Sequence, residues 1–125
     1  MDTQSPLLDL DQLKMLVKVA EEKSVTLLQE TLDLFIQENQ SIFKDLLDNL
    51  LEKDNGWVSH KMHYIGGCSS NIGLFSVAQE CKKIELLLEK ECPAAEEKIR
   101  LCKRVRQLCL DSIDAYQEYI DALKN

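Results

Sequence analysis

Apolar residues recur every three or four positions along most of this 125-residue chain, and few helix-breaking residues interrupt them. The chain contains only 2 prolines and 4 glycines, which leaves too few turn residues for an all-β fold. Apolar residues at this spacing lie on one face of an α-helix. The sequence therefore predicts an all-α protein in which long amphipathic helices bury their apolar faces against one another.

Turn and capping signals divide the chain into five expected helices. Ser24 is a candidate N-cap, Asp54-Asn55-Gly56 is a turn signal, and Gly73 is expected to break or bend the chain after the third helix. The fourth helix is expected to end at Cys92-Pro93, because the residue before a proline disfavours the helical region. The expected helices are about 9–20, 24–53, 57–71, 74–91 and 94 to near the end of the chain.

Short connections between long helices favour antiparallel neighbours. The sequence thus predicts an antiparallel up-down-up-down four-helix bundle with a short additional N-terminal helix, formed by residues 1–125 as a single domain. The second helix is expected to bury a stripe in which polar Asn39 fills one position: Leu28, Leu32, Phe35, Ile42, Leu46 and Leu50. The last two helices are expected to bury Val77, Cys81, Ile84, Leu88, Cys102, Val105, Cys109, Tyr116, Ile120 and Leu123.

Charge and cysteine content narrow the classes of partner and compartment. The formal net charge is −7 and the isoelectric point about 4.8, which argues against a nucleic-acid-binding protein, since such proteins use a basic surface. The 5 cysteines form no Cys-x-x-Cys pair, so we expect reduced thiols in the core and a cytoplasmic location. The N-terminus does not resemble a signal peptide, and no stretch approaches the roughly 20 apolar residues of a membrane span, so no membrane contact is expected.

The segment from His63 to Gly73 departs from the helical pattern and is the candidate site. It contains three of the four glycines, and a glycine inside a helix costs roughly 1 kcal/mol relative to alanine. The residues that share a helical face with His63 are all polar or small: Ser59, His60, Gly66, Gly67 and Ser70. We expect that face to be exposed to solvent, where a neutral imidazole is a competent nucleophile near neutral pH.

This segment resembles the phosphoacceptor motif of histidine-containing phosphotransfer (HPt) domains. In the family the motif is roughly His-x-Leu-Lys-Gly-Ser-Ser/Ala-x-x-Leu/Ile-Gly, and here it is His63-Tyr64-Ile65-Gly66-Gly67-Cys68-Ser69-Ser70-Asn71-Ile72-Gly73. Downstream, Cys81-Lys82-Lys83-Ile84-Glu85 is similar to the family's Cys-x-x-Leu-Glu. Trp57 lies where such domains often carry a tryptophan.

The resemblance implies that His63 accepts a phosphoryl group from the aspartate of a receiver domain and passes it to another receiver in a multistep two-component phosphorelay. It also implies that Gly67 leaves room for the phosphoryl group and that Gly73 ends the active-site helix. Gly66 stands where the family usually has a lysine whose cation steadies the phosphoryl group. A non-catalytic HPt-like adaptor that binds receiver domains without efficient phosphotransfer is therefore the alternative.

Other residues could serve the phosphoryl group in place of that lysine. His60 and Ser70 share the face of His63 and could donate hydrogen bonds. Lys82 or Lys83 could reach the site from the next helix. His60 by itself is typical of an ordinary surface histidine, and a hydrogen-bonding role beside His63 is the alternative.

Other classes of chemistry find little support in the sequence. A metal site at His60 and His63 is not expected, because no carboxylate or cysteine on their face completes a tetrahedral set. No P-loop, catalytic triad or kinase ATP-binding signature occurs, so we expect a monomeric phosphocarrier that has no cofactor, binds no ATP and does not phosphorylate itself. A structural bundle unrelated to signalling is the remaining alternative, and a buried His63 ring would indicate it.

Overall fold

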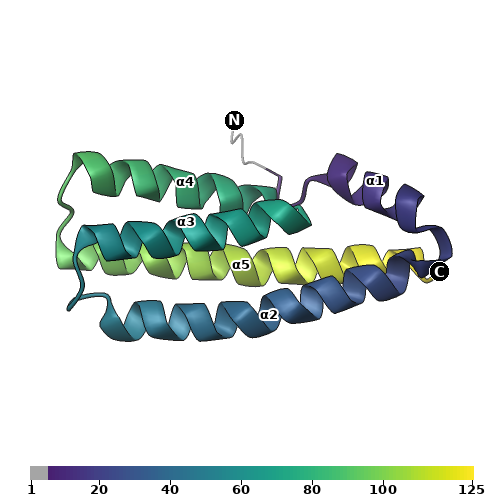
Figure 1. Ribbon diagram of the computed structural model, residues 1–125, viewed down its shortest axis with the longest axis horizontal. Helices are drawn as coiled ribbons and strands as arrows, with labels where there is room; N and C mark the ends of the chain where they lie inside the picture. The colour runs from purple at the N-terminus through teal and green to yellow at the C-terminus, as the bar shows by residue number, and fades with distance from the viewer. Residues whose placement is uncertain (1–5) are drawn as a thin grey trace.

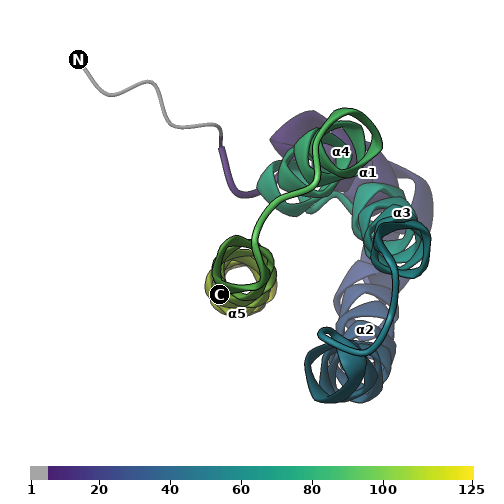
Figure 2. The same cartoon turned by 90° about the vertical axis from the view of Figure 1, so that its left-hand side faces the viewer.

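The structure, a computed structural model, describes residues 6–125. This part of the chain forms five α-helices, a short 3-10 helix and no strands: α1 (Leu10–Ala20), η1 (Glu21–Lys23), α2 (Ser24–Asn49), α3 (Asn55–Ile72), α4 (Phe75–Lys90) and α5 (Ala95–Leu123). Successive helices from α2 to α5 run antiparallel, and α1 lies at the end of the bundle where α2 begins (Figure 1). The view along the bundle in Figure 2 shows α3 between α2 and α4. The predicted all-α four-helix bundle with an additional N-terminal helix is confirmed.

The core consists of the apolar faces of these helices. Every residue predicted to be inward on α4 and α5 is buried except Leu123, which is partly buried. On α2 the prediction for Ile42 is wrong, because Phe43 is buried and Ile42 is only partly buried. Both residues border the same stripe, so spacing does not separate them, and the larger aromatic side chain takes the inner position. Asn39 occupies its predicted place in the stripe and is buried.

Three helix ends differ from the prediction. Ser24 is not an N-cap: its φ of −59° and ψ of −43° are helical, because the chain enters α2 directly from the 3-10 helix. Helix α2 ends at Asn49, earlier than expected. Helix α3 begins at Asn55, because the Asp54 side chain accepts a hydrogen bond of 2.9 Å from the Trp57 backbone N–H and caps the helix there.

The link between α3 and α4 also holds α1 in place. Gly73 has a φ of 89° and ends α3 in the left-handed conformation that glycine adopts without steric cost, as predicted. Its carbonyl accepts a hydrogen bond of 2.8 Å from the Asp9 N–H at the start of α1. The Gln12 side chain donates to the carbonyls of Ser70 and Asn71 at the end of α3. These bonds satisfy the last carbonyls of α3 and attach α1 to the bundle.

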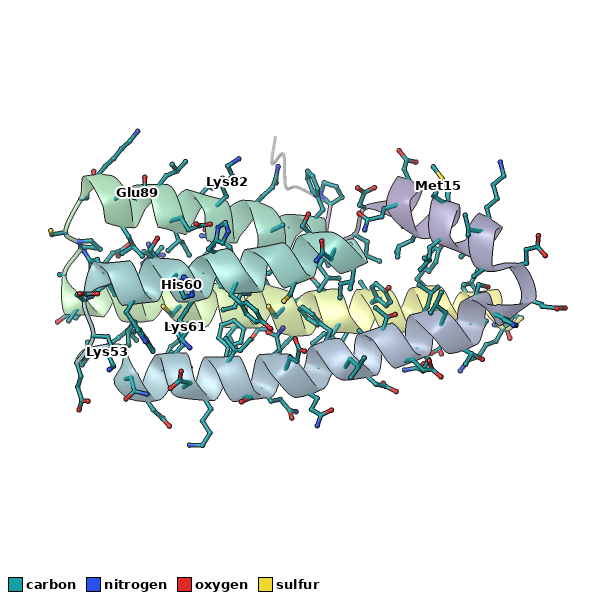
Figure 3. The ribbon with its side chains drawn as sticks, viewed as in Figure 1. Met15, Lys53, His60, Lys61, Lys82 and Glu89 are labelled. Atoms are coloured by element: carbon teal, nitrogen blue, oxygen red, sulfur yellow. The ribbon has the colours of Figure 1, made fainter. Side chains whose placement is uncertain are left out.

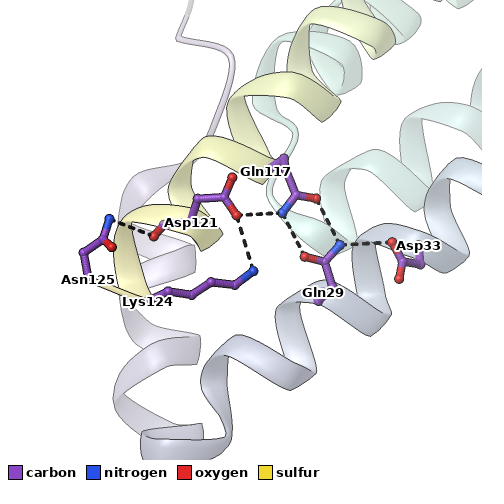
Figure 4. Close-up of polar contacts among 6 residues, drawn as sticks. All are labelled: Gln29, Asp33, Gln117, Asp121, Lys124 and Asn125. Atoms are coloured by element: carbon purple, nitrogen blue, oxygen red, sulfur yellow. Dashed lines mark hydrogen bonds and ion pairs between the residues drawn. The ribbon is translucent and has the colours of Figure 1, made fainter.

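A pair of glutamines joins α2 to α5 near the C-terminus (Figure 4). Each side-chain amide of Gln29 and Gln117 donates to the oxygen of the other, at 3.0 and 2.8 Å. The same amides also donate to Asp33 and Asp121, one turn along their own helices. Because both glutamines donate and accept, the pair fixes the register of two helices that are far apart in sequence.

All five cysteines are free. Cys81, Cys102 and Cys109 lie in the core as expected, and Cys68 is half-buried. Burial raises the pKa of the Cys102 thiol to about 11 and the pKa of Cys109 to about 12. Cys92 is exposed between α4 and α5, so the expectation that it belongs to the core is wrong. No helix among residues 6–125 combines the length and apolar character needed to cross a membrane.

Candidate functional site

His63 lies on the outer face of α3, and its side chain is 77% exposed. The residues of α3 that face the core are Val58, Met62, Ile65 and Ser69, so the histidine occupies the opposite side of the helix. The predicted exposure of the imidazole is confirmed. A buried ring would have indicated a structural bundle unrelated to signalling, so the exposed ring gives that alternative no support.

Glu85 of α4 holds the His63 ring. Its Oε1 lies 3.0 Å from the Nδ1 of His63, and its side chain is only 22% exposed. An ionised carboxylate accepts hydrogen bonds but does not donate them, so Nδ1 carries the proton of the neutral ring. Nε2 then keeps its lone pair, and a neighbouring helix fixes the orientation of the imidazole.

Glu85 was not among the predicted site residues. It is the last residue of Cys81-Lys82-Lys83-Ile84-Glu85, the segment that resembles the family's Cys-x-x-Leu-Glu, so a signal was present. Helical spacing within α3 gave no indication of it, because the contact joins residues that lie 22 positions apart in the chain. Only the packing of α4 against α3 brings the carboxylate to the ring.

A hollow of about 380 Å³ lies between α3 and α4 beside the imidazole. Four of the predicted site residues line it: His63, Gly66, Gly67 and Ser70. His60 is exposed one turn away and does not line the hollow. The wall on α4 includes Glu85, Glu89 and Lys82, whereas Lys83 lies outside it.

The two adjacent glycines have different surroundings. A Cβ atom added at Gly66 would lie 3.1 Å from the Cβ of Cys81, so this glycine permits the close approach of α3 and α4. A Cβ added at Gly67 would meet nothing within 4 Å. Gly67 therefore leaves open space beside His63, whereas the packing of two helices accounts for Gly66.

Two lysines near the start of α3, Lys61 and Lys53, are engaged away from the hollow. Lys61 forms an ion pair of 2.9 Å with Asp45 of α2, and its ammonium lies 5.1 Å from the centre of the Trp57 ring. Lys53, in the link before α3, contacts the same ring at 5.9 Å. Figure 3 shows Lys82 and Glu89 on α4, and His60 and Lys61 on α3. No group of three or more potential metal ligands occurs among residues 6–125.

Comparison with known proteins finds a solved structure of similar fold. The chain is similar in fold to the crystal structure of histidine-containing phosphotransfer protein B (HptB) from Pseudomonas aeruginosa PAO1, with a TM-score of 0.73. Sequence identity is 21%, and the match covers 95% of this chain and 98% of that chain. Comparison with curated protein sequences gives no significant match.

The family model of the Hpt domain matches residues 30–125. This range begins within α2, extends to the end of the chain, and includes both His63 and Glu85. The resemblance noted in the histidine segment thus extends over most of the sequence and agrees with the helical bundle. The chain belongs to the Hpt domain family.

Proposed function

We propose that this protein relays a phosphoryl group between receiver-domain aspartates in a multistep two-component phosphorelay, with His63 as the phosphoacceptor. The observation that carries the proposal is the exposed imidazole whose Nδ1 lies 3.0 Å from the Glu85 carboxylate. An exposed ring is accessible to a partner protein, and the hydrogen bond selects the tautomer in which Nε2 is nucleophilic.

Transfer to this protein begins with the Nε2 lone pair of His63 and the phosphorus of an aspartyl phosphate. The N–P bond forms while the P–O bond to the aspartyl carboxyl breaks, and the electrons of that bond stay on the carboxylate oxygen. The imidazole retains its Nδ1 proton and so gains a positive charge. Glu85 stabilises this charge through the same hydrogen bond. Transfer to the next receiver is the reverse of this step.

The surroundings of His63 suit a protein partner. The hollow at its side is open to solvent, and Leu86 on its rim is 47% exposed. Such a surface allows a receiver domain to bring its aspartyl phosphate to the ring, with the receiver supplying the metal ion and acidic pocket, as the resemblance implies. In this proposal the protein is a monomeric cytoplasmic phosphocarrier that neither binds ATP nor phosphorylates itself.

A labelled receiver domain provides the test. The wild-type protein, His63→Gln and His60→Gln are each mixed with receiver carrying ³²P on its aspartate, and label on each protein is followed with time. His60 is a matched control, because it is an exposed histidine of the same helix outside the hollow. We expect label on the wild type and on His60→Gln and none on His63→Gln; label retained by His63→Gln would refute the proposal.

Gly66 supports the second candidate, the adaptor that binds receivers without transfer. It leaves α3 without a cation at the position where the family usually has lysine. If receiver binding persists in a pull-down while the wild type acquires no label, the adaptor function is correct. The same experiment therefore separates the two candidates.

A further inference from the structure

Lys82 is the lysine that faces the hollow beside His63. It projects from α4, and it is the one Lys or Arg among the residues that line the hollow. Lys83, its neighbour in sequence, lies on α4 outside the hollow. The sequence does not show which of the two lysines reaches the site. The packing of α4 on α3 places Lys82 beside His63 and leaves Lys83 outside the hollow.

The ammonium of Lys82 is not engaged elsewhere in the described part of the chain. No carboxylate among residues 6–125 lies within 4 Å of it, and its side chain is exposed. In contrast, Lys61 on α3 is held by Asp45. Lys82 is therefore free to pair with an anion that enters the hollow.

The side chains that α4 places around the hollow include two carboxylates besides the ammonium of Lys82. Glu85 and Glu89 line the same space, and a phosphoryl group on His63 would add about two further negative charges at neutral pH. Gly66 contributes no side chain to balance them. Without Lys82, the only charged side chains of α4 that line the hollow would be the two carboxylates of Glu85 and Glu89.

We propose that Lys82 supplies, from α4, the positive charge that stabilises the phosphoryl group on His63. This inference rests on the proposed phosphoacceptor role of His63. A lysine ammonium has three donors on a flexible four-carbon stem, so it can reach phosphoryl oxygens from a neighbouring helix. It lowers the free energy of the phosphorylated protein and so shifts the transfer equilibrium away from the receiver's aspartyl phosphate.

The test measures the equilibrium ratio of phosphorylated protein to phosphorylated receiver. Lys82→Gln removes the charge and retains most of the side chain, Lys82→Arg retains the charge, and Lys83→Gln is the matched control one position away. An exposed charge contact contributes up to roughly 1 kcal/mol, so we expect Lys82→Gln to lower the ratio about fivefold. Lys82→Arg and Lys83→Gln should stay within about twofold of the wild type, and high salt should reduce the difference.

The outcomes distinguish this inference from the function on which it rests. If the wild type acquires label but Lys82→Gln and Lys83→Gln have the same ratio, the role of Lys82 is refuted and His63 remains the acceptor. If the wild type acquires no label at all, both proposals are overturned. Circular dichroism of the variants checks the fold, which exposed substitutions on α4 should leave unchanged.

Discussion

The two adjacent glycines of α3 should respond in opposite ways to the same substitution. Gly66→Ala places a Cβ 3.1 Å from the Cβ of Cys81, whereas Gly67→Ala places one in open space. Both positions are helical, so alanine gains about 1 kcal/mol of intrinsic helix stability at each. The comparison therefore isolates the contact between α3 and α4.

The magnitude follows from the geometry at Cys81. A Cβ is fixed to its backbone, so neither atom of the new contact can rotate away and one helix must shift by a few tenths of an ångström. Overpacking of this kind costs typically about 1–3 kcal/mol. We therefore expect Gly67→Ala to stabilise the protein by about 1 kcal/mol and Gly66→Ala to destabilise it by about 1 kcal/mol, a difference of roughly 2 kcal/mol.

Urea unfolding followed by circular dichroism measures this difference. With a slope of about 2 kcal/mol per molar urea, typical of small proteins, the two midpoints should differ by about 1 M. Cys81→Gly removes the opposing Cβ, so in a double-mutant cycle it should cost less stability in the Gly66→Ala background than in the wild type. Equal stabilisation by both alanines would refute the close approach of the helices at Gly66.

Three further predictions concern the site, a helix cap and pH. Glu85→Ala should slow phosphotransfer to His63 about tenfold, because it removes the charge-assisted hydrogen bond to the ring. Glu89→Ala, the control from the same hollow, should change the rate less than about threefold, and rapid-quench kinetics measure both rates. Asp54→Ala should lower the free energy of unfolding by about 1 kcal/mol through loss of the α3 N-cap, as measured in urea. Burial keeps the thiols of Cys102 and Cys109 protonated in the folded protein, whereas in the unfolded chain they lose their protons above the ordinary thiol pKa of 9.0. The free energy of unfolding should therefore fall as pH rises from 9 towards 12. A melting temperature that stays constant over this range would contradict the burial of these thiols.

Sequence spacing predicted the features that depend on local structure. The buried stripes of α4 and α5 follow from helical periodicity, and the left-handed end of α3 follows from Gly73. The first turn of α3 was missed because Asn55-Gly56 is a common turn dipeptide, and the cap at Asp54 outweighs that preference. Helical periodicity and glycine positions were thus sufficient to predict the helices. The error at the start of α3 arose because a turn signal and a capping signal compete there.

The candidate site could be predicted only in part, because it is shared between two helices. The exposed face around His63 is a property of α3 and follows from the small and polar residues one turn away. The contact with Glu85 and the position of Lys82 depend on how α4 is rotated about its axis against α3. The spacing of residues within one helix gives no information about that rotation. The contributions of Glu85 and Lys82 could therefore be identified only from the assembled bundle.

Gly66 links these two halves of the site. Its missing side chain removes a cation from α3, and the same absence lets α4 approach until Cys81 faces the glycine. Glu85 and Lys82 lie on α4 within one turn of Cys81, so this approach also sets their distance from His63. A lysine introduced at position 66 would therefore have two opposed effects, because its charge attracts a phosphoryl group while its Cβ forces α4 away. The site works with a glycine here only if α4 supplies the groups that α3 lacks.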